Sequence, residues 1–167
     1  MVSRKTLLNL YKCSPVPVHE KNMRTWRQYA HRRIGVGLGS GKCTGVFYHL
    51  KPERSAKIHK SPDFIVIEKS RTNTDKVRTL FHEIGHFRYM KRYGWKSENS
   101  PIEEAFAERY ALREMIKHRL YASANRSVEC VIYWRDCGEK DIYAAAARRL
   151  LIDKQYRKMA KELKRNK

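Results

Sequence analysis

The alternation of apolar and polar residues predicts two short strands in the first half of the chain. Residues 44–50 (TGVFYHL) and 64–68 (FIVIE) are rich in β-branched and aromatic side chains, and a Ser-Pro-Asp turn precedes the second run. We expect both segments to belong to one small sheet. A short basic helix is expected before them at 23–33, with an apolar stripe of Met23, Trp26, Tyr29 and Ala30.

Helical periodicity begins after the second strand. A loop is expected at 70–74, followed by a helix that begins near Lys76 with Thr74 or Asp75 as its cap. Gly94 is placed to end this helix, because glycine readily adopts the left-handed conformation of a helix C-terminus.

The remaining third of the chain contains one clear helix start and one ambiguous stretch. Ser-Pro-Ile-Glu at 100–103 combines an N-cap serine, a proline in the first turn and a glutamate at the third position, so a helix is predicted at 101–119. Residues 121–140 fit either a strand or a buried helical turn. From residue 141 to the end, the pattern predicts one long, basic, amphipathic helix.

These elements predict an α+β fold. A chain of 167 residues fits a single domain. We divide it into a basic N-terminal part (1–60), a core part (61–120) and a helical C-terminal part (121–167).

The charge changes the picture, because the chain carries 37 Lys and Arg against 17 Asp and Glu, a net charge of +20. The net charge is +11 over residues 1–60, +2 over 61–147 and +7 over 148–167. Basic flanks of this kind are typical of proteins that bind a polyanion such as nucleic acid, although a solvated surface gives the same composition. Nucleic-acid contact through the flanks, with Trp26, Tyr29, Tyr48 and Tyr156 as stacking candidates, is therefore one interpretation.

The cysteines and the N-terminus argue for a protein of the cell interior. Cys13, Cys43, Cys130 and Cys137 form no CxxC pair, so we expect free, reduced thiols rather than a zinc ribbon. The first residues lack the apolar run of a signal peptide, and no stretch is long enough to cross a membrane. We expect a cytoplasmic location.

The glycine-rich stretch at 34–45 (IGVGLGSGKCTG) resembles a phosphate-binding loop but departs from its pattern. Val36 stands where the first glycine is required, and Cys43 replaces the Ser or Thr that would hold magnesium. A turn or lid that leads into the first strand is the better prediction.

The candidate chemistry lies in His82-Glu83-Ile84-Gly85-His86. Histidines four residues apart occupy one face of a helix, so both imidazoles can bind one zinc ion. Glu83 is rotated by about 100° from His82, where it can accept a proton from water at the metal without binding the metal itself.

A third ligand is needed, because a catalytic zinc has three protein ligands and an open position. Arg92 stands where a third histidine would follow, so a glutamate from the next helix is expected instead. Glu104 and Glu108 share a helix face, and one can bind the metal while the other accepts a hydrogen bond from a histidine ring. The alternative is that Glu103, Glu104 and Glu108 form a solvated face paired with Arg109 and Arg113, but the alanines at 105, 107 and 111 favour close approach of another helix.

HEIGH followed by EAFAE (104–108) resembles the gluzincin metallopeptidases. The similarity is greatest to zincin domains of the anthrax-lethal-factor type and of phages, and the chain is also similar to the ImmA/IrrE metallopeptidases, although it lacks their EAN triplet. The resemblance covers residues 63–115. It implies a zincin-like fold with a small sheet packed on the two motif helices. It also implies Zn²⁺ bound by His82, His86 and Glu104, with Glu83 as general base and Glu108 supporting a ligand.

The function predicted from these residues is zinc-dependent hydrolysis of peptide bonds in a peptide or protein substrate, and a nucleoprotein is one candidate target. Tyr93, Arg109, Tyr110 and His118 are the candidates for a donor to the peptide oxyanion, and residues 64–68 are the strand expected to pair with the substrate. The alternative is a basic nucleic-acid-binding protein without enzymatic activity, in which the motif is a structural or vestigial metal site.

Overall fold

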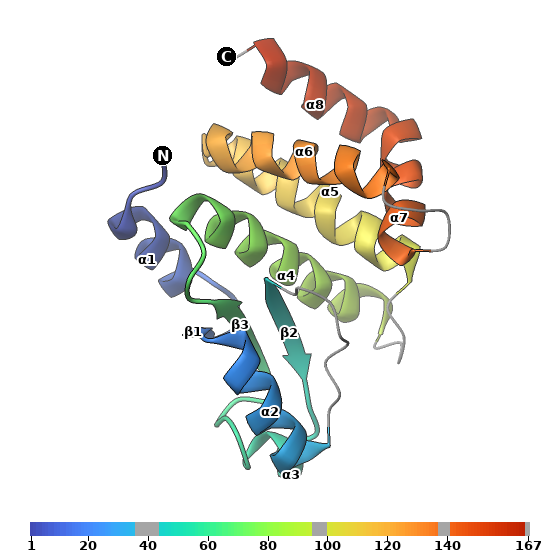
Figure 1. Ribbon diagram of the computed structural model, residues 1–167. Helices are drawn as coiled ribbons and strands as arrows, with labels where there is room; N and C mark the ends of the chain where they lie inside the picture. Colours follow the sequence, from blue (N-terminus) through green and yellow to red (C-terminus); the bar gives the residue numbers. More distant parts are fainter. Residues whose placement is uncertain (36–43, 95–99, 137–140, 166–167) are drawn as a thin grey trace.

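The computed structural model describes residues 1–35, 44–94, 100–136 and 141–165. It shows an α+β fold that is mostly helical, with one three-stranded sheet (Figure 1). Helix α4 (Asn73–Tyr93) lies between this sheet and the layer formed by helices α5 (Pro101–Lys117), α6 (Tyr121–Asp136), α7 (Ile142–Ile152) and α8 (Lys154–Arg165). The helix that carries the HEIGH motif is therefore the central element of the molecule.

The sheet has the order β1-β3-β2, with β1 (Val18–Lys21) parallel and β2 (Gly45–His49) antiparallel to the central strand β3 (Asp63–Glu68). The predicted strands at 44–50 and 64–68 are confirmed with boundaries shifted by one residue. The expectation that 64–68 would pair with a substrate is wrong, because β3 is flanked on both sides. Strand β2 is the antiparallel edge.

The two faces of β3 are covered by different helices. Ile65 and Ile67 are fully buried in the main core together with α4, whereas Phe64 and Val66 form a second cluster with Met23 of helix α2 (Met23–Ile34). Alternate side chains of a strand point to opposite faces, so a strand covered on both faces has a continuous apolar sequence.

The second cluster also accounts for two of the aromatic side chains considered for base stacking. The Trp26 indole donates a hydrogen bond to the Tyr48 hydroxyl over 3.0 Å, and Tyr48 stacks on Phe64. Tyr156 is 1% exposed in the main core. These three aromatics therefore serve packing, and only Tyr29 of the four is exposed.

The boundaries of α4 and α5 follow from their caps. Helix α4 begins earlier than predicted, because Thr72 accepts a hydrogen bond from the Asp75 amide and replaces the expected Thr74 or Asp75 as cap. It ends at Gly94, as predicted, where φ is 79°. Helix α5 begins as predicted, with the Ser100 hydroxyl accepting from the Glu103 amide.

The C-terminal region is two helices rather than the single helix predicted from residue 141 onward. Asp153 interrupts it with an extended backbone (φ −68°, ψ 120°). Its carboxylate accepts hydrogen bonds from the Tyr156 amide at 2.8 Å and from Arg109 at 2.7 Å. Asp153 thus caps α8 and ties it to α5. The ambiguous stretch at 121–140 contains helix α6.

The N-terminal segment contains two elements that the sequence pattern did not indicate, helix α1 (Arg4–Lys12) and strand β1. Glu20 of β1 links the sheet to α4, because it accepts a hydrogen bond from Lys76 at 2.8 Å and pairs with Arg4. Burial alone would raise the pKa of Glu20, but the hydrogen bonds from Lys76 and Arg4 outweigh burial and lower its pKa. A short helix α3 (Pro52–Ser55) connects β2 to β3.

Several predictions concern segments outside the described residues. The glycine-rich turn or lid falls largely on residues 36–43, and two of the cysteines, at 43 and 137, are likewise not described. Cys13 and Cys130 are free thiols. Within the described part of the chain, no helix has both the length and the apolar character needed to cross a membrane.

Candidate metal centre

The site depends on an unusually close contact between α4 and α5. A side-chain carbon placed on Gly85 would lie 2.6 Å from the Cα atom and 2.8 Å from the carbonyl oxygen of Ala107. No residue larger than glycine fits at this position without moving α5. Ala107 and Ala111 are fully buried, as expected from the small residues of α5. The glycine of the motif therefore sets the distance between the two helices.

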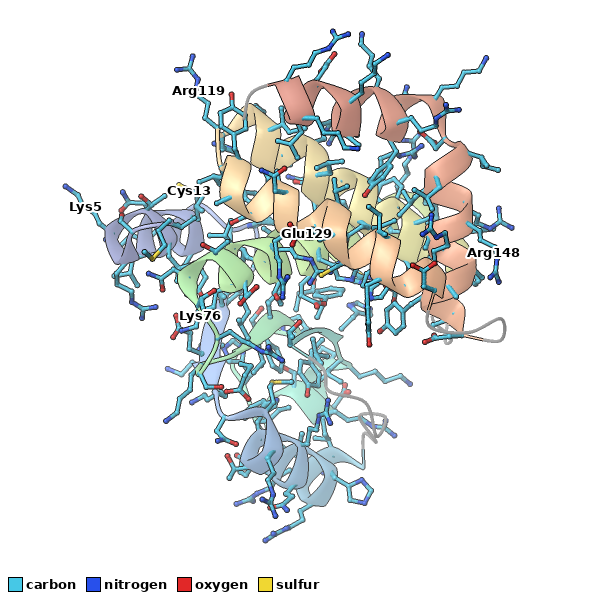
Figure 2. The ribbon with its side chains drawn as sticks, turned by 45° about the horizontal axis from the view of Figure 1, so that its top comes forward. Lys5, Cys13, Lys76, Arg119, Glu129 and Arg148 are labelled. Atoms are coloured by element: carbon cyan, nitrogen blue, oxygen red, sulfur yellow. The ribbon has the colours of Figure 1, made fainter. Side chains whose placement is uncertain are left out.

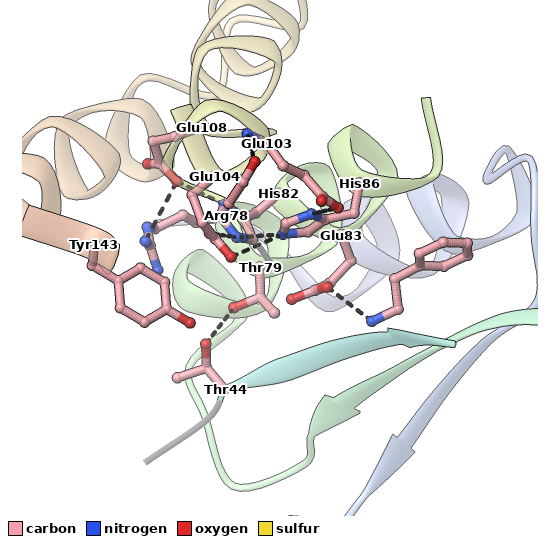
Figure 3. Close-up of polar contacts among 12 residues, drawn as sticks. Thr44, Arg78, Thr79, His82, Glu83, His86, Glu103, Glu104, Glu108 and Tyr143 are labelled. Carbon is pink, nitrogen blue, oxygen red and sulfur yellow. Dashed lines mark hydrogen bonds and ion pairs between the residues drawn. The ribbon is translucent and has the colours of Figure 1, made fainter. Parts of the chain in front are cut away.

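The close contact brings two imidazoles and one carboxylate together (Figure 3). The Nε2 atoms of His82 and His86 are 3.2 Å apart. Glu104 Oε2 lies 3.3 Å from His82 Nε2, and Glu104 Oε1 lies 3.6 Å from His86 Nε2. One ligand atom from each residue lies within 4.8 Å of the others, so His82, His86 and Glu104 form a buried group that could hold a metal ion.

Each imidazole is held from behind by a second carboxylate. His82 Nδ1 lies 2.8 Å from Glu108 Oε2, and His86 Nδ1 lies 2.9 Å from Glu103 Oε1. Sequence reasoning expected such a role for Glu108 but not for Glu103, which appeared only in the capping box and in the alternative of a solvated helix face. Glu103, Glu104 and Glu108 are all buried, so the alternative of a solvated helix face is wrong.

The donor set fits a cation. When both Nδ1 atoms donate to carboxylates, both Nε2 atoms present lone pairs, and these face each other and Glu104. Glu104 Oε2 is buried and has no hydrogen-bond partner among the described residues. A buried polar atom without a partner is costly, and here it lies 3.3 Å from His82 Nε2, with His86 Nε2 next to the other oxygen of the same carboxylate. A metal ion or protons must satisfy this group, and two histidines with a carboxylate are a common zinc ligand set.

The electrostatics of the chain without metal show how strongly the site attracts positive charge. Burial disfavours the charged imidazole of His82, but its interactions with the Glu104 and Glu108 carboxylates outweigh burial and raise its pKa to about 10. Burial opposes ionisation of Glu108, but nearby Arg78 and His82 lower its pKa to about 2. The carboxylates of Glu104 and Glu108 therefore remain ionised and keep the imidazoles protonated. A metal ion would have to displace these protons.

Two residues that the sequence did not single out support Glu108. The guanidinium of Arg78 on α4 lies 3.6 Å from Glu108 Oε2, and the buried hydroxyl of Ser127 on α6 donates to Glu108 Oε1. Neither residue belongs to a recognisable motif. Each is positioned by the packing of its helix against α5.

Glu83 lies on the side of α4 that faces the sheet. Its Oε2 accepts a hydrogen bond from the Phe47 amide of the edge strand β2 at 2.9 Å (Figure 3). The side chain is 7% exposed, and burial raises the pKa of this carboxyl group. The carboxylate thus has an increased affinity for a proton and lies beside an edge strand.

The four candidate oxyanion donors do not face the cluster. Arg109 and Tyr110 line a groove on the other side of α5, Tyr93 packs against Tyr89 with tilted rings, and His118 stacks on Phe81. Figure 3 instead shows the hydroxyl of Tyr143 on α7 turned toward the side of the site where Thr44 and Thr79 lie. Tyr143 is far from the motif in sequence, so no local pattern could predict this placement.

Comparison of the chain with family models, curated proteins and solved structures gave no match. The geometry of the site and the motif therefore carry the functional argument alone.

Proposed function

We propose that this protein is a zinc-dependent metallopeptidase of the zincin type, with His82, His86 and Glu104 as the zinc ligands. The observation that carries the proposal is the convergence of both Nε2 atoms on the Glu104 carboxylate, whose Oε2 is buried without a hydrogen-bond partner among the described residues. The carboxylates behind both imidazoles support it, because they fix the ring tautomer that a metal requires. The resemblance of HEIGH and EAFAE to gluzincin motifs adds the reaction class.

Zinc at this site supplies Lewis acidity, which lowers the pKa of water toward about 7 and polarises a substrate carbonyl. Glu83 accepts a proton from water as the new carbon–oxygen bond forms, and returns it to the amine nitrogen as the carbon–nitrogen bond breaks. Burial prepares Glu83 for this role by raising its pKa. Glu103 and Glu108 keep the imidazoles oriented throughout.

The substrate is proposed to bind as an extended peptide along β2, in place of the β3 position expected from sequence. Strand β2 is the antiparallel edge of the sheet and carries Phe47, whose amide already contacts Glu83. Gly45 allows β2 to approach α4 closely, because a side-chain carbon there would lie 2.3 Å from Thr79 Cγ2 and 3.2 Å from Glu83 Oε1. An extended substrate on this edge lies next to the proposed base.

The decisive experiment combines elemental analysis with peptide hydrolysis by the parent chain and Glu83→Gln. One zinc per chain is expected in both proteins. Glutamine keeps an oxygen that accepts the Phe47 amide but cannot act as a base, so hydrolysis is expected to fall by about 10²–10⁴-fold. A library of unstructured peptides supplies the substrate, with cleavage read by mass spectrometry.

The same measurement separates the proposal from a structural metal site, in which Glu83 only ties β2 to α4. Zinc in both proteins with equal cleavage, or zinc with no cleavage by the parent chain of any library peptide, supports the structural site. Parent protein purified without zinc that fails to bind added zinc would refute both interpretations.

A further inference from the structure

A groove of about 990 Å³ lies between the C-terminal half of α4, helix α5 and helix α8. It faces away from the metal centre, because Arg88 and Lys91 are separated by roughly 120–180° around α4 from the two motif histidines. On α5, Arg113 is likewise rotated by roughly 140–180° from Glu104 and Glu108. The same helix pair thus forms a closed site on one face and an open groove on the other.

The groove is strongly cationic. Its lining includes seven Lys and Arg side chains and two glutamates, Glu114 and Glu162. Glu114 pairs with Arg113 at 3.1 Å and lies 3.8 Å from Lys117, and Arg109 pairs with Asp153. Among the described residues, the other four groove cations form no ion pair: Arg88, Lys91, Arg92 and Lys158. Like charges that share a concave surface raise the local potential and attract anions.

Aromatic side chains form part of the same wall. Phe106 and Tyr110 line the groove. The centroid of the Phe106 ring lies 5.4 Å from that of Tyr89 and 6.2 Å from that of the half-exposed Tyr93. The Arg113 guanidinium lies 5.1 Å from the Tyr110 ring centroid, and that of Arg92 lies 5.2 Å from the Tyr93 ring. Cations interleaved with accessible ring faces are the combination that binds unpaired bases together with their phosphates.

We propose that the α4–α5–α8 groove binds single-stranded nucleic acid, with its unpaired cations on successive phosphates and Phe106 and Tyr93 against the bases. This placement differs in part from the flanks considered from sequence, because α4 and α5 belong to the part of the chain whose net charge is nearly balanced and only α8 belongs to the basic C-terminal flank. Glu83, Glu103, Glu104 and Glu108 of that part are buried around the metal centre, whereas Arg88, Lys91 and Arg92 are exposed in the groove. Among the described residues that line the groove, none belongs to a base-reading element, so binding is expected to be independent of sequence.

The test uses the full chain and a fluorescent single strand of about 12 nucleotides, with anisotropy measured over a range of salt. The variant Arg88→Gln/Arg92→Gln/Lys158→Gln removes cations that hold no ion pair, so the fold is expected to remain, as circular dichroism can verify. Affinity is expected to fall by about tenfold or more, and the slope of log affinity against log salt by about 2. Phe106→Leu keeps an apolar side chain but removes the ring, and is expected to cost about fivefold.

The matched control removes three exposed cations of the N-terminal helices, Lys5→Gln/Lys12→Gln/Arg24→Gln. Figure 2 shows Lys5 pointing away from the body of the molecule. This control is expected to change affinity by less than about twofold. Equal losses in both triple variants would show that net charge alone attracts the strand and overturn the groove. Tighter binding of the matched duplex, or of vesicles with anionic lipid, would assign the groove to a different partner.

Discussion

The two faces of the α4–α5 pair differ in the burial and pairing of their charged side chains. On the face toward the sheet and α6, His82, Glu104 and Glu108 are nearly inaccessible, and each contacts an oppositely charged or hydrogen-bonding group. On the other face, Arg88 and Lys91 are exposed and, within the described residues, form no ion pair.

The difference follows from the cost of burial. An ion removed from water requires compensation by a partner, whereas an exposed lysine or arginine gains little from one. Lys76, on the same helix as the groove cations, illustrates the rule because it is 5% exposed and paired with Glu20. Two sets of charged groups remain available to a ligand. A metal ion can neutralise the carboxylates on the closed face, and an anion can neutralise the cations on the open face.

The largest effect is expected from Glu104→Ala, which removes a proposed ligand from the closed face. Loss of a supporting hydrogen bond at a metal site costs about 10–100-fold in affinity, and loss of the ligand is expected to exceed this. Competition with a chromogenic chelator measures the change. Glu129→Ala, which removes an exposed glutamate of α6, serves as the control and is expected to bind zinc as the parent does. Retention of parent affinity by Glu104→Ala would show that the ligand set is wrong.

The contact between the helices can be broken by Gly85→Ala. Alanine favours a helix by about 1 kcal/mol relative to glycine. Overpacking against Ala107 is expected to outweigh this, with a cost of about 1–3 kcal/mol. Chemical denaturation should show a net loss of stability, together with weaker zinc binding. Adding Ala107→Gly is not expected to restore either property, because the closest contacts are to the backbone of Ala107. Full rescue by the second substitution would contradict this account.

A smaller effect is expected from Glu103→Gln, which removes the charge behind His86 but keeps an oxygen that can accept from Nδ1. Zinc affinity is expected to fall by about tenfold, the low end for such supporting residues. Glu103→Asp retains the charge with a shorter side chain and separates the effect of charge from that of reach. An unchanged affinity in Glu103→Gln would mean that the hydrogen bond alone orients His86.

The smallest effect is expected on stability, from breaking the ion pair between Lys76 and Glu20. The pKa of Glu20 is lowered in the folded protein, so its stabilising contribution is present above the ordinary glutamate pKa of about 4.3 and is lost as the pH falls through the folded value. Glu20→Gln is therefore expected to lower the free energy of unfolding by about 1–2 kcal/mol near neutral pH, and by progressively less in acid. Urea titrations of both proteins across this range measure the difference. A constant difference at all pH values would exclude the ion pair as its source.

The elements around the motif could be predicted because local signals define them. The cap at Ser100, the glycine at 94 and the β-branched runs of β2 and β3 each act within a few residues. The position of β3 in the centre of the sheet could not be predicted, because it depends on pairing with β1, a strand of only four residues.

The same distinction applies to the C-terminal half. Residues near Asp153 have a continuous helical pattern, and Asp153, which interrupts it, caps α8 and also accepts a hydrogen bond from Arg109, far away in sequence. Within the site, the spacing of HEIGH predicts that both imidazoles share a face, which the structure shows. The contributions of Arg78 and Ser127 depend on how α4 and α6 pack against α5, and no short-range pattern encodes them.

Glu108 joins three helices through one carboxylate. It belongs to α5, accepts from His82 of α4, and accepts from Ser127 of α6. Helix α6 supplies none of the proposed ligands, yet its position is linked to the imidazole that would bind the ion. Local opening of α6 would therefore release the support of His82, and loading of the site would oppose that opening. Metal binding is therefore expected to stabilise α6 against local opening. Slower amide hydrogen exchange in α6 would measure this effect.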